Sequence, residues 1–289
     1  MPSASTISGY TYENWGPVTT TFTPPSSCAT ASNKIEVGPS DSSRPIFRYG
    51  LQCETVGGWE CYPSATIDTT TTPDTNPTQF FKAHYYSPGL YCPADWVTVG
   101  VASWGGDGDK SLITSGVLAP TTTAEIVQRD GEVFLGILDK SETAVICCPR
   151  SYSADVEYGC WSTISDYKPS SACNWEIPKV DWLGSSSIKT TINGTATTRY
   201  LQTLAGTSPF VGPATTTFDA EDKKTLVGMA VNPMLTLIYK KADFEDAGPT
   251  STNHAARLTP GSSSWNGFGS VVGISVVAMM LGAAIVLPL

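Results

Sequence analysis

Short apolar runs, separated by polar residues, recur along the first 245 residues of the chain. They are rich in Val, Ile, Thr, Tyr and Trp and are bounded by clusters of Gly, Pro, Asp and Ser, a pattern typical of β-strands. Apolar residues at helical spacing are absent from the sequence outside the C-terminal segment. We therefore predict a mainly β fold with a hairpin turn at 106–109 and strands at 18–22, 46–51, 97–104, 132–138, 144–147, 199–204, 225–231 and 235–239.

The C-terminal segment has a different pattern. Residues 268–287 carry no charge, and Ser270 and Ser275 are their only polar side chains. Twenty residues of helix span about 30 Å, the thickness of a bilayer core. We predict a single C-terminal transmembrane helix within 267–289. A cleaved lipid-anchor signal is the alternative, because small residues at 261–264 precede the apolar run.

These patterns divide the chain into three parts. Residues 1–245 are predicted to form a β-rich extracellular domain, with an internal boundary at the low-complexity tract 66–79 if it contains two units. Residues 246–266 are rich in Ser, Thr, Pro and Gly and are predicted to form a solvated stalk. Residues 267–289 are the predicted anchor.

The eight cysteines indicate an oxidising compartment. No two have C-x-x-C spacing, and the chain has only two His, so disulfides are favoured over a zinc site. Eight cysteines allow 105 pairings. Cys147 and Cys148 are adjacent, and adjacent side chains on a strand point to opposite faces, so we expect them to have different partners. The candidate disulfide residues are Cys28, Cys53, Cys61, Cys92, Cys147, Cys148, Cys160 and Cys173.

The N-terminus does not match this setting. Residues 1–30 show neither the basic nor the apolar stretch of a signal peptide. Together with a C-terminal transmembrane helix, such an N-terminus would by itself indicate a tail-anchored protein whose main domain faces the cytosol. The cysteines and the Thr/Ser/Pro-rich tracts, which are usual sites of O-glycosylation, favour the opposite side of the membrane. We expect a signal segment to precede Met1 and the ectodomain to lie outside the plasma membrane.

Charge and composition exclude some partners. The net charge is −9, from 17 Lys and Arg against 26 Asp and Glu, so the chain lacks the cations of a general nucleic-acid binder. The chain contains 37 Thr and 31 Ser. Asn193 begins an Asn-Gly-Thr sequon and is the candidate N-glycosylation site.

No pattern of catalytic or metal-binding residues stands out. The chain has no G-x-S-x-G motif to position a nucleophile, and His84 is predicted to be a surface or partly packed residue. Asp107 and Asp109 are too few oxygen ligands for a Ca²⁺ loop and are predicted to lie in a solvated turn. No spacing pairs two carboxylates for glycoside hydrolysis. We predict no enzyme activity, no metal and no cofactor.

The eight tryptophans are the residues most suited to stack on sugar rings. In a disulfide-rich β domain, most tryptophans pack in the core against cystines. Trp59, which follows Gly57-Gly58, and Trp104, which precedes Gly105-Gly106, are the best candidates for exposed glycan-stacking positions.

One motif occurs twice: an aromatic residue lies three positions after Cys-Pro, at Trp96 and at Tyr152. With the segments SPG-x-x-CP-x-x-W at 87–96 and ETAV-x-CCP-x-x-Y at 142–152, Cys160 and the Ser-rich stalk before an apolar tail, the chain resembles membrane-anchored surface proteins of filamentous ascomycete fungi. The resemblance covers about half of the chain. It implies a cell-surface setting and no known activity.

Together, these observations predict a membrane-anchored protein of the fungal cell surface with a structural or interaction role at the cell wall. The first alternative is a carbohydrate-binding module that uses exposed tryptophans, with cell-wall polysaccharide as partner. The second is a wall-remodelling glycosidase.

Overall fold

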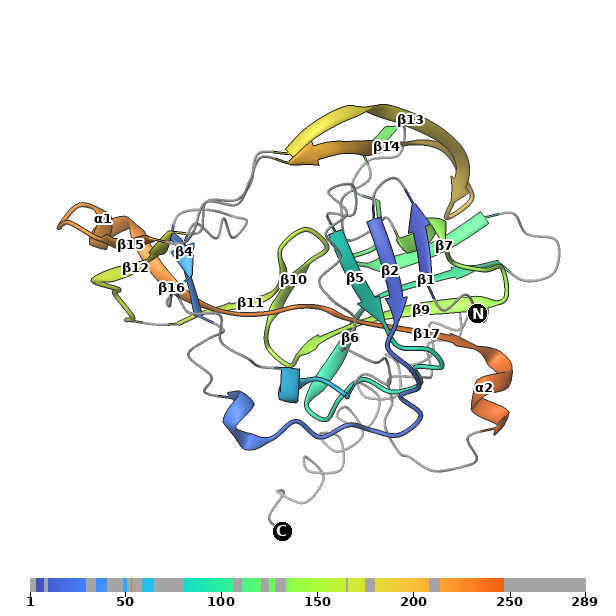
Figure 1. Cartoon of the computed structure of the whole chain (residues 1–289). Helices are drawn as coiled ribbons and strands as arrows, with labels where there is room; N and C mark the ends of the chain where they lie inside the picture. The colour runs from blue at the N-terminus through green and yellow to red at the C-terminus, as the bar shows by residue number, and fades with distance from the viewer. Residues whose placement is uncertain are drawn as a thin grey trace, which may run out of the picture. The chain divides into compact units, whose positions relative to one another are not determined.

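The computed structural model describes residues 4–7, 10–29, 35–40, 49–50, 53, 59–64, 81–105, 111–120, 125–127, 134–164, 166–174, 180–207 and 214–246. The chain divides into two compact units, Met1–Arg257 and Leu258–Leu289, and all described residues belong to the first. This part of the chain is mainly β, as predicted (Figure 1). Its strands form three sheets.

One of the two seven-stranded sheets, which we call the large sheet, contains the longest strands of the described residues. All neighbouring strands are antiparallel except the pairs β7–β13 and β8–β14. In spatial order the sheet consists of β17 (Leu235–Lys240), β9 (Glu142–Pro149), β6 (Trp96–Trp104), β7 (Ser111–Gly116), β13 (Val180–Ile192), β14 (Thr195–Thr207) and β8 (Glu125–Val127).

The other two sheets are a small three-stranded one and a seven-stranded antiparallel one made of shorter strands. The small sheet has the order β1 (Ala4–Ile7), β2 (Tyr10–Asn14) and β5 (Phe81–Tyr85), with β2 and β5 parallel. The third sheet has the order β10 (Ser153–Asp155), β11 (Gly159–Thr163), β16 (Leu226–Asn232), β3 (Ile35–Pro39), β4 (Tyr49–Gly50), β12 (Ser171–Asn174) and β15 (Ala214–Thr217).

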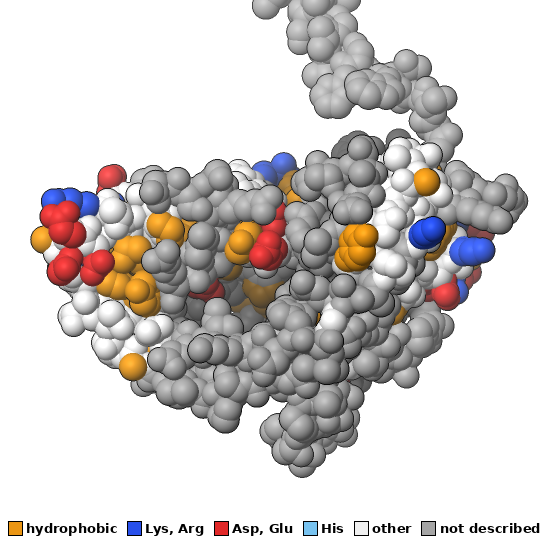
Figure 2. All heavy atoms as spheres, turned by 90° about the horizontal axis from the view of Figure 1, so that it is seen from above, with side chains coloured by type: hydrophobic (Ala, Val, Ile, Leu, Met, Phe, Trp, Pro, Cys, Tyr) orange, Lys and Arg blue, Asp and Glu red, His pale blue; other side chains and the backbone are white. Residues whose placement is uncertain are grey.

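Helical structure within the described ranges is short. The helices are η1 (Ser26–Ala29), η3 (Trp59–Cys61), α1 (Asp222–Thr225) and α2 (Lys241–Asp246). Lys224 of α1 forms an ion pair of 2.6 Å with Glu221. Figure 2 shows acidic and basic side chains gathered at the end of the domain where α1 lies.

Strand β9 is buried on both faces, which explains its continuous apolar sequence. Ala144 and Ile146 belong to one core cluster, with Tyr10, Tyr12 and Tyr85 of the small sheet. Val145 and Cys147 belong to a second cluster. A strand covered on both faces loses the apolar–polar alternation of a half-exposed strand.

The second cluster lies under irregular segments rather than under a sheet. Its members outside the strands are Val18, Cys61, Tyr62, Tyr86 and Cys92, and Leu235 and Leu237 of β17 also belong to it. Tyr86 N–H donates to the Thr236 carbonyl at 3.0 Å, and Ile238 N–H donates to the Tyr86 carbonyl at 2.9 Å. These bonds join the end of β5 to the edge of the large sheet.

Two predicted strands are wrong. Residues 19–25 are irregular and only Val18 forms a bridge, to Gly89. Pro17, Pro24 and Pro25 flank the predicted strand and have no N–H groups, so a ladder cannot extend through them on either side. In 132–138 the structure has a 3₁₀ turn at 134–136. Phe134, Leu135 and Leu138 are all buried, and this spacing suits a helical turn rather than a strand.

The remaining strand predictions agree with the structure where it describes them. Strands at 97–104, 144–147, 199–204, 225–231 and 235–239 correspond to β6, β9, β14, β16 and β17, and 49–50 of the predicted 46–51 form β4. The turn at 106–109 lies outside the described residues, but Trp104 of β6 pairs with Leu112 of β7, which confirms the hairpin.

The predicted anchor, almost all of the stalk and the tract 66–79 lie outside the described residues. Within the described ranges, no helix has the length and apolar character needed to cross a membrane.

Candidate functional site

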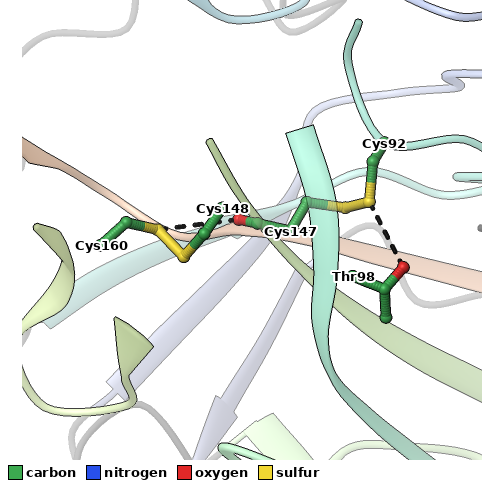
Figure 3. The surroundings of a disulfide bond; sticks show 5 residues. All are labelled: Cys92, Thr98, Cys147, Cys148 and Cys160. Carbon is green, nitrogen blue, oxygen red and sulfur yellow. Dashed lines mark hydrogen bonds between the residues drawn. A yellow bond between two sulfur atoms is a disulfide. The ribbon is translucent and has the colours of Figure 1, made fainter. Parts of the chain in front are cut away.

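All eight cysteines form disulfides, as predicted. Cys147 is bonded to Cys92, and Cys148 is bonded to Cys160. The adjacent cysteines therefore do have different partners, on opposite sides of β9 (Figure 3). The Thr98 hydroxyl lies 3.7 Å from Cys92 Sγ, to which it donates. The other pairs are Cys28–Cys61 and Cys53–Cys173.

The two Cys-Pro-x-x-aromatic motifs fold into the same turn. Trp96 N–H donates to the Pro93 carbonyl at 3.0 Å, and Tyr152 N–H donates to the Pro149 carbonyl at 3.1 Å. The residue before each aromatic has a left-handed backbone, with φ 62° at Asp95 and 70° at Ser151. A positive φ at this position is the feature of a type II turn. The recurrence in the sequence is therefore a structural repeat.

The two turns lie side by side and are joined directly. Trp96 is the register partner of Pro149 where β6 pairs with β9. Arg150 N–H donates to the Asp95 carbonyl at 2.8 Å. A third segment completes the arrangement, because Ala94 N–H donates to the Phe22 carbonyl at 2.7 Å.

These three segments surround a cavity of about 380 Å³, which we call the twin-turn cavity. Residues 94–96 and 149–152 form two of its sides, residues 23–28 and Cys61 form another, and Asn232 of β16 completes it. The Cys28–Cys61 disulfide therefore lies in its wall.

The twin-turn cavity combines aromatic rings with hydrogen-bonding groups. The Trp96 indole packs edge-on against Tyr62, at a centroid distance of 6.1 Å and an interplanar angle of 78°. Tyr152 is hydrogen-bonded to Asn232, and burial raises its phenol pKa more than that bond lowers it. Arg150 and Asp95 are exposed at the cavity. The apolar faces of a ligand could pack against the aromatic rings, and its hydroxyl groups could form hydrogen bonds with the polar side chains.

A second cavity has a volume of about 340 Å³ and shares no described lining residue with the first; we call it the aromatic cavity. Seven of its lining residues carry rings: Tyr12, Trp15, Tyr62, His84, Tyr85, Tyr86 and Phe134. His84 stacks on Trp15 at 3.9 Å between ring centroids, and its Nδ1 lies 3.6 Å from Glu13 Oε2. The parallel pairing of β2 and β5 places Glu13 and His84 opposite each other. His84 is thus partly packed, as predicted.

Burial raises the pKa of both Tyr62 and Tyr86, and the proximity of Tyr86 adds to the effect at Tyr62. Both phenols are neutral in the folded and unfolded chain below pH about 10. Above it the unfolded chain ionises first, so this contribution to stability is lost as the pH rises. We expect tyrosinate absorbance at 295 nm from these residues to appear only with loss of the β circular dichroism. Ionisation near pH 10 in the folded chain would contradict this.

A variant with Tyr62→Phe and Tyr86→Phe provides the control. It lacks both buried phenols, so its alkaline unfolding midpoint should lie higher than that of the wild type. The Tyr86 hydroxyl donates to the Pro63 carbonyl at 2.8 Å, so a modest loss of stability at neutral pH is also expected.

Trp104, one of the two predicted glycan-stacking residues, is not among the described lining residues of either cavity. Trp104 ends β6, packs against the first core cluster and donates from its indole N–H to the Leu138 carbonyl at 3.0 Å. Trp59 begins η3, and its side chain lies outside the described residues. Sugar stacking at these two positions stays a prediction.

Asn193, the candidate glycosylation site, forms a clamp between strands. Asn193 and Gly194 have φ values of 49° and 80° and make the tight turn of the β13–β14 hairpin. Asn193 Oδ1 accepts from Thr114 N–H at 2.8 Å, and Nδ2 donates to the Thr114 carbonyl at 3.1 Å. The side-chain nitrogen that an N-glycan would occupy is therefore hydrogen-bonded to β7.

Single replacements of Asn193 and Thr195 distinguish the role of the clamp from that of the sequon. Either replacement abolishes the sequon, but only the one at Asn193 removes the clamp. Asn193→Ala also removes three hydrogen bonds to Thr114 and the residue suited to a positive φ, and we expect a loss of about 2–3 kcal/mol in unfolding free energy. Thr195→Ala removes an exposed side chain and should change it by less than about 0.5 kcal/mol. Urea denaturation of both variants measures this. Equal losses would show that a glycan, not the clamp, stabilises the hairpin.

Asp107 and Asp109 lie outside the described residues. Among the residues that are described, no three His, Cys, Asp or Glu side chains gather in a way that could hold a metal ion. The cavity residues that were not predicted as site residues from the sequence include Trp15, Trp96, Arg150 and Tyr152. The repeated Cys-Pro-x-x-aromatic motif was the available signal for the last three; Trp15 had none.

Comparison with known proteins gave no matching family model, no matching curated protein and no matching solved structure.

Proposed function

We propose that this chain is a cell-surface protein whose β-rich ectodomain binds a sugar unit of a wall polysaccharide in the twin-turn cavity. The observation that carries the proposal is the convergence of Trp96, Tyr152, Arg150 and Asn232 on one cavity, through two copies of the same turn. A structural or interaction role at the wall then follows from binding the wall's own polymer.

Sugar rings have apolar C–H faces and hydroxyl edges, and the cavity offers partners for both. The Trp96 and Tyr152 rings suit the faces. The Arg150 guanidinium, a donor, and the Asp95 carboxylate, an acceptor, suit the hydroxyls. Asp95 is the only carboxylate among the described lining residues, and glycoside hydrolysis ordinarily uses two. Binding without hydrolysis is therefore favoured over the glycosidase alternative.

The cavity is held in shape by covalent bonds. The Cys28–Cys61 disulfide lies in its wall, and Cys92–Cys147 and Cys148–Cys160 tie the Cys-Pro end of each turn to another segment. A site that is rigid before binding loses less conformational entropy when the ligand arrives. This supports recognition of a simple repeating unit without a change of shape.

The setting at the cell surface is part of the proposal. Four disulfides favour an oxidising environment. The uncharged run 268–287 supports a C-terminal transmembrane helix, and the small residues before it leave a lipid anchor as the alternative. Release from cells by a phosphatidylinositol-specific phospholipase would select the lipid anchor.

Binding of the full chain, in detergent, to an array of wall oligosaccharides tests the proposal. Arg150→Ala removes an exposed charged donor without touching the core, and we expect affinity for the bound glycan to fall about 10-fold. Trp96→Ala should abolish binding. Lys189→Ala, an exposed change on β13, is the matched control and should bind as the wild type does.

Two results would overturn the assignment. If no oligosaccharide binds, the cavity has another ligand. If Arg150→Ala and Trp96→Ala bind normally while Trp104→Ala does not, the sugar stacks on the tryptophan predicted from the sequence instead.

A further inference from the structure

The aromatic cavity has a chemistry that the sugar-binding proposal does not use. Its lining is dominated by ring carbons from Trp15, Tyr62, Tyr86 and Phe134, with Met234 and Leu235 beside them. At about 340 Å³, it is more than twice the size of an engineered apolar cavity, about 150 Å³, that takes up benzene. The cavity is partly open to solvent, and small-molecule sites are typically apolar clefts of about 300–1,000 Å³ with a few polar groups, so a space of this size and lining points to a ligand.

The walls of the aromatic cavity are fixed by the backbone and by ring contacts. Trp15 N–H donates to the Tyr85 carbonyl at 2.8 Å, and Trp15 stacks on His84 while meeting Tyr86 edge-on at 6.0 Å. Tyr86 is held at both ends, by its backbone bonds to β17 and by its hydroxyl on the Pro63 carbonyl. The cavity is therefore formed before any ligand enters.

The lining selects against charge. Its described residues include no Asp, Glu, Lys or Arg, and its polar side-chain groups are those of His84 and Thr236, the Trp15 indole N–H and the tyrosine hydroxyls. A cation in an aromatic site gains from the ring faces, but here it would lose its hydration without a carboxylate in the lining. Glu13 lies against His84 and is not among the lining residues. An uncharged ligand fits this chemistry better.

We propose that the aromatic cavity is a second binding site, separate from the twin-turn cavity, for a small uncharged ring compound with at most a few polar groups. A flat ring can lie against the walls formed by Trp15 and Tyr86. The hydrogen-bonding groups of the lining can orient one hydroxyl or amine on that ring.

Fluorine NMR of 5-fluoroindole with the full chain in detergent micelles tests this site. Empty micelles give the blank for partition of the probe into detergent. We expect the probe to bind the wild type with a dissociation constant of about 1 mM or below, as is usual for a ligand of about ten heavy atoms. Ala83→Phe places a ring into the cavity from β5 and should weaken binding at least about 10-fold.

Further variants keep the test independent of folding and of sugar binding. Should Ala83→Phe lose its β circular dichroism, Met234→Trp fills the same cavity from the connection between β16 and β17. Arg150→Ala, in the twin-turn cavity, should leave 5-fluoroindole binding unchanged. Equal binding by wild type and both filled variants, or no binding beyond empty micelles, would overturn the proposal. If tetramethylammonium displaces 5-fluoroindole and phenol does not, the cavity binds a cation rather than an uncharged ring compound.

Discussion

Replacing Cys92 and Cys147 together by alanine is expected to lower the free energy of unfolding by about 4 kcal/mol. The bond closes a loop with a sequence separation of 55 residues, and the chain-entropy model relates loop length to stabilisation. Both cysteines are buried, at 5% and 0% exposure, so the space they leave adds to the loss. Urea denaturation followed by tryptophan fluorescence, without reductant, measures the change.

The Cys148–Cys160 pair provides the matched comparison on the same strand (Figure 3). Its sequence separation is 12, so the same model gives about 3 kcal/mol for the alanine double variant. The order of the two losses is the test. A larger loss for Cys148–Cys160 would show that strain or residual structure in the unfolded chain, rather than loop length, governs these bonds.

The second large effect is expected at Gly116, which ends β7. Its φ is +61°, and a Cβ there would lie 1.9 Å from the Val99 carbonyl oxygen and 2.8 Å from the Val99 carbonyl carbon. That oxygen accepts the hydrogen bond from Val117 N–H at 3.0 Å. The clash is with backbone, so β6 and β7 must separate at the centre of the large sheet. We expect Gly116→Ala to cost more than about 3 kcal/mol.

A second variant, Gly194→Ala, distinguishes the steric part of the cost of Gly116→Ala from the conformational part. Gly194 also has a positive φ, +80°, but nothing lies within 4 Å of a Cβ built on it. Gly194→Ala should therefore cost only the left-handed penalty of about 1–2 kcal/mol. Thermal unfolding of both variants gives the comparison. Equal shifts in Tm would mean that the sheet relaxes around the new methyl group of Gly116→Ala without loss.

Much of the local structure could be predicted from the sequence. The runs at 97–104, 144–147 and 235–239 are strands because β-branched and aromatic residues between turn-forming clusters favour extended backbone. The separate partners of Cys147 and Cys148 follow from side-chain alternation on a strand. The errors at 18–22 and 132–138 have local causes as well: prolines on both sides of the first segment and the spacing of Phe134, Leu135 and Leu138 in the second.

The candidate sites could be predicted only in part. Trp96 and Tyr152 could be singled out because their motif repeats, yet nothing in the spacing of two motifs 56 positions apart says that the turns meet. Nothing in the sequence indicated that Trp15 and His84 meet. Their stacking depends on the parallel pairing of β2 with β5, two strands separated by more than 60 residues.

The β character of this protein, the presence of disulfides and the apolar C-terminal run follow from the amino-acid sequence alone, since each depends on properties of residues close together in the chain. Which cysteines pair, which strands are neighbours and where the two cavities lie depend instead on contacts between distant segments, such as Cys53 with Cys173 and Tyr86 with Leu237. Local pattern fixes the face on which a side chain lies, but the packing of the whole core selects what it meets there.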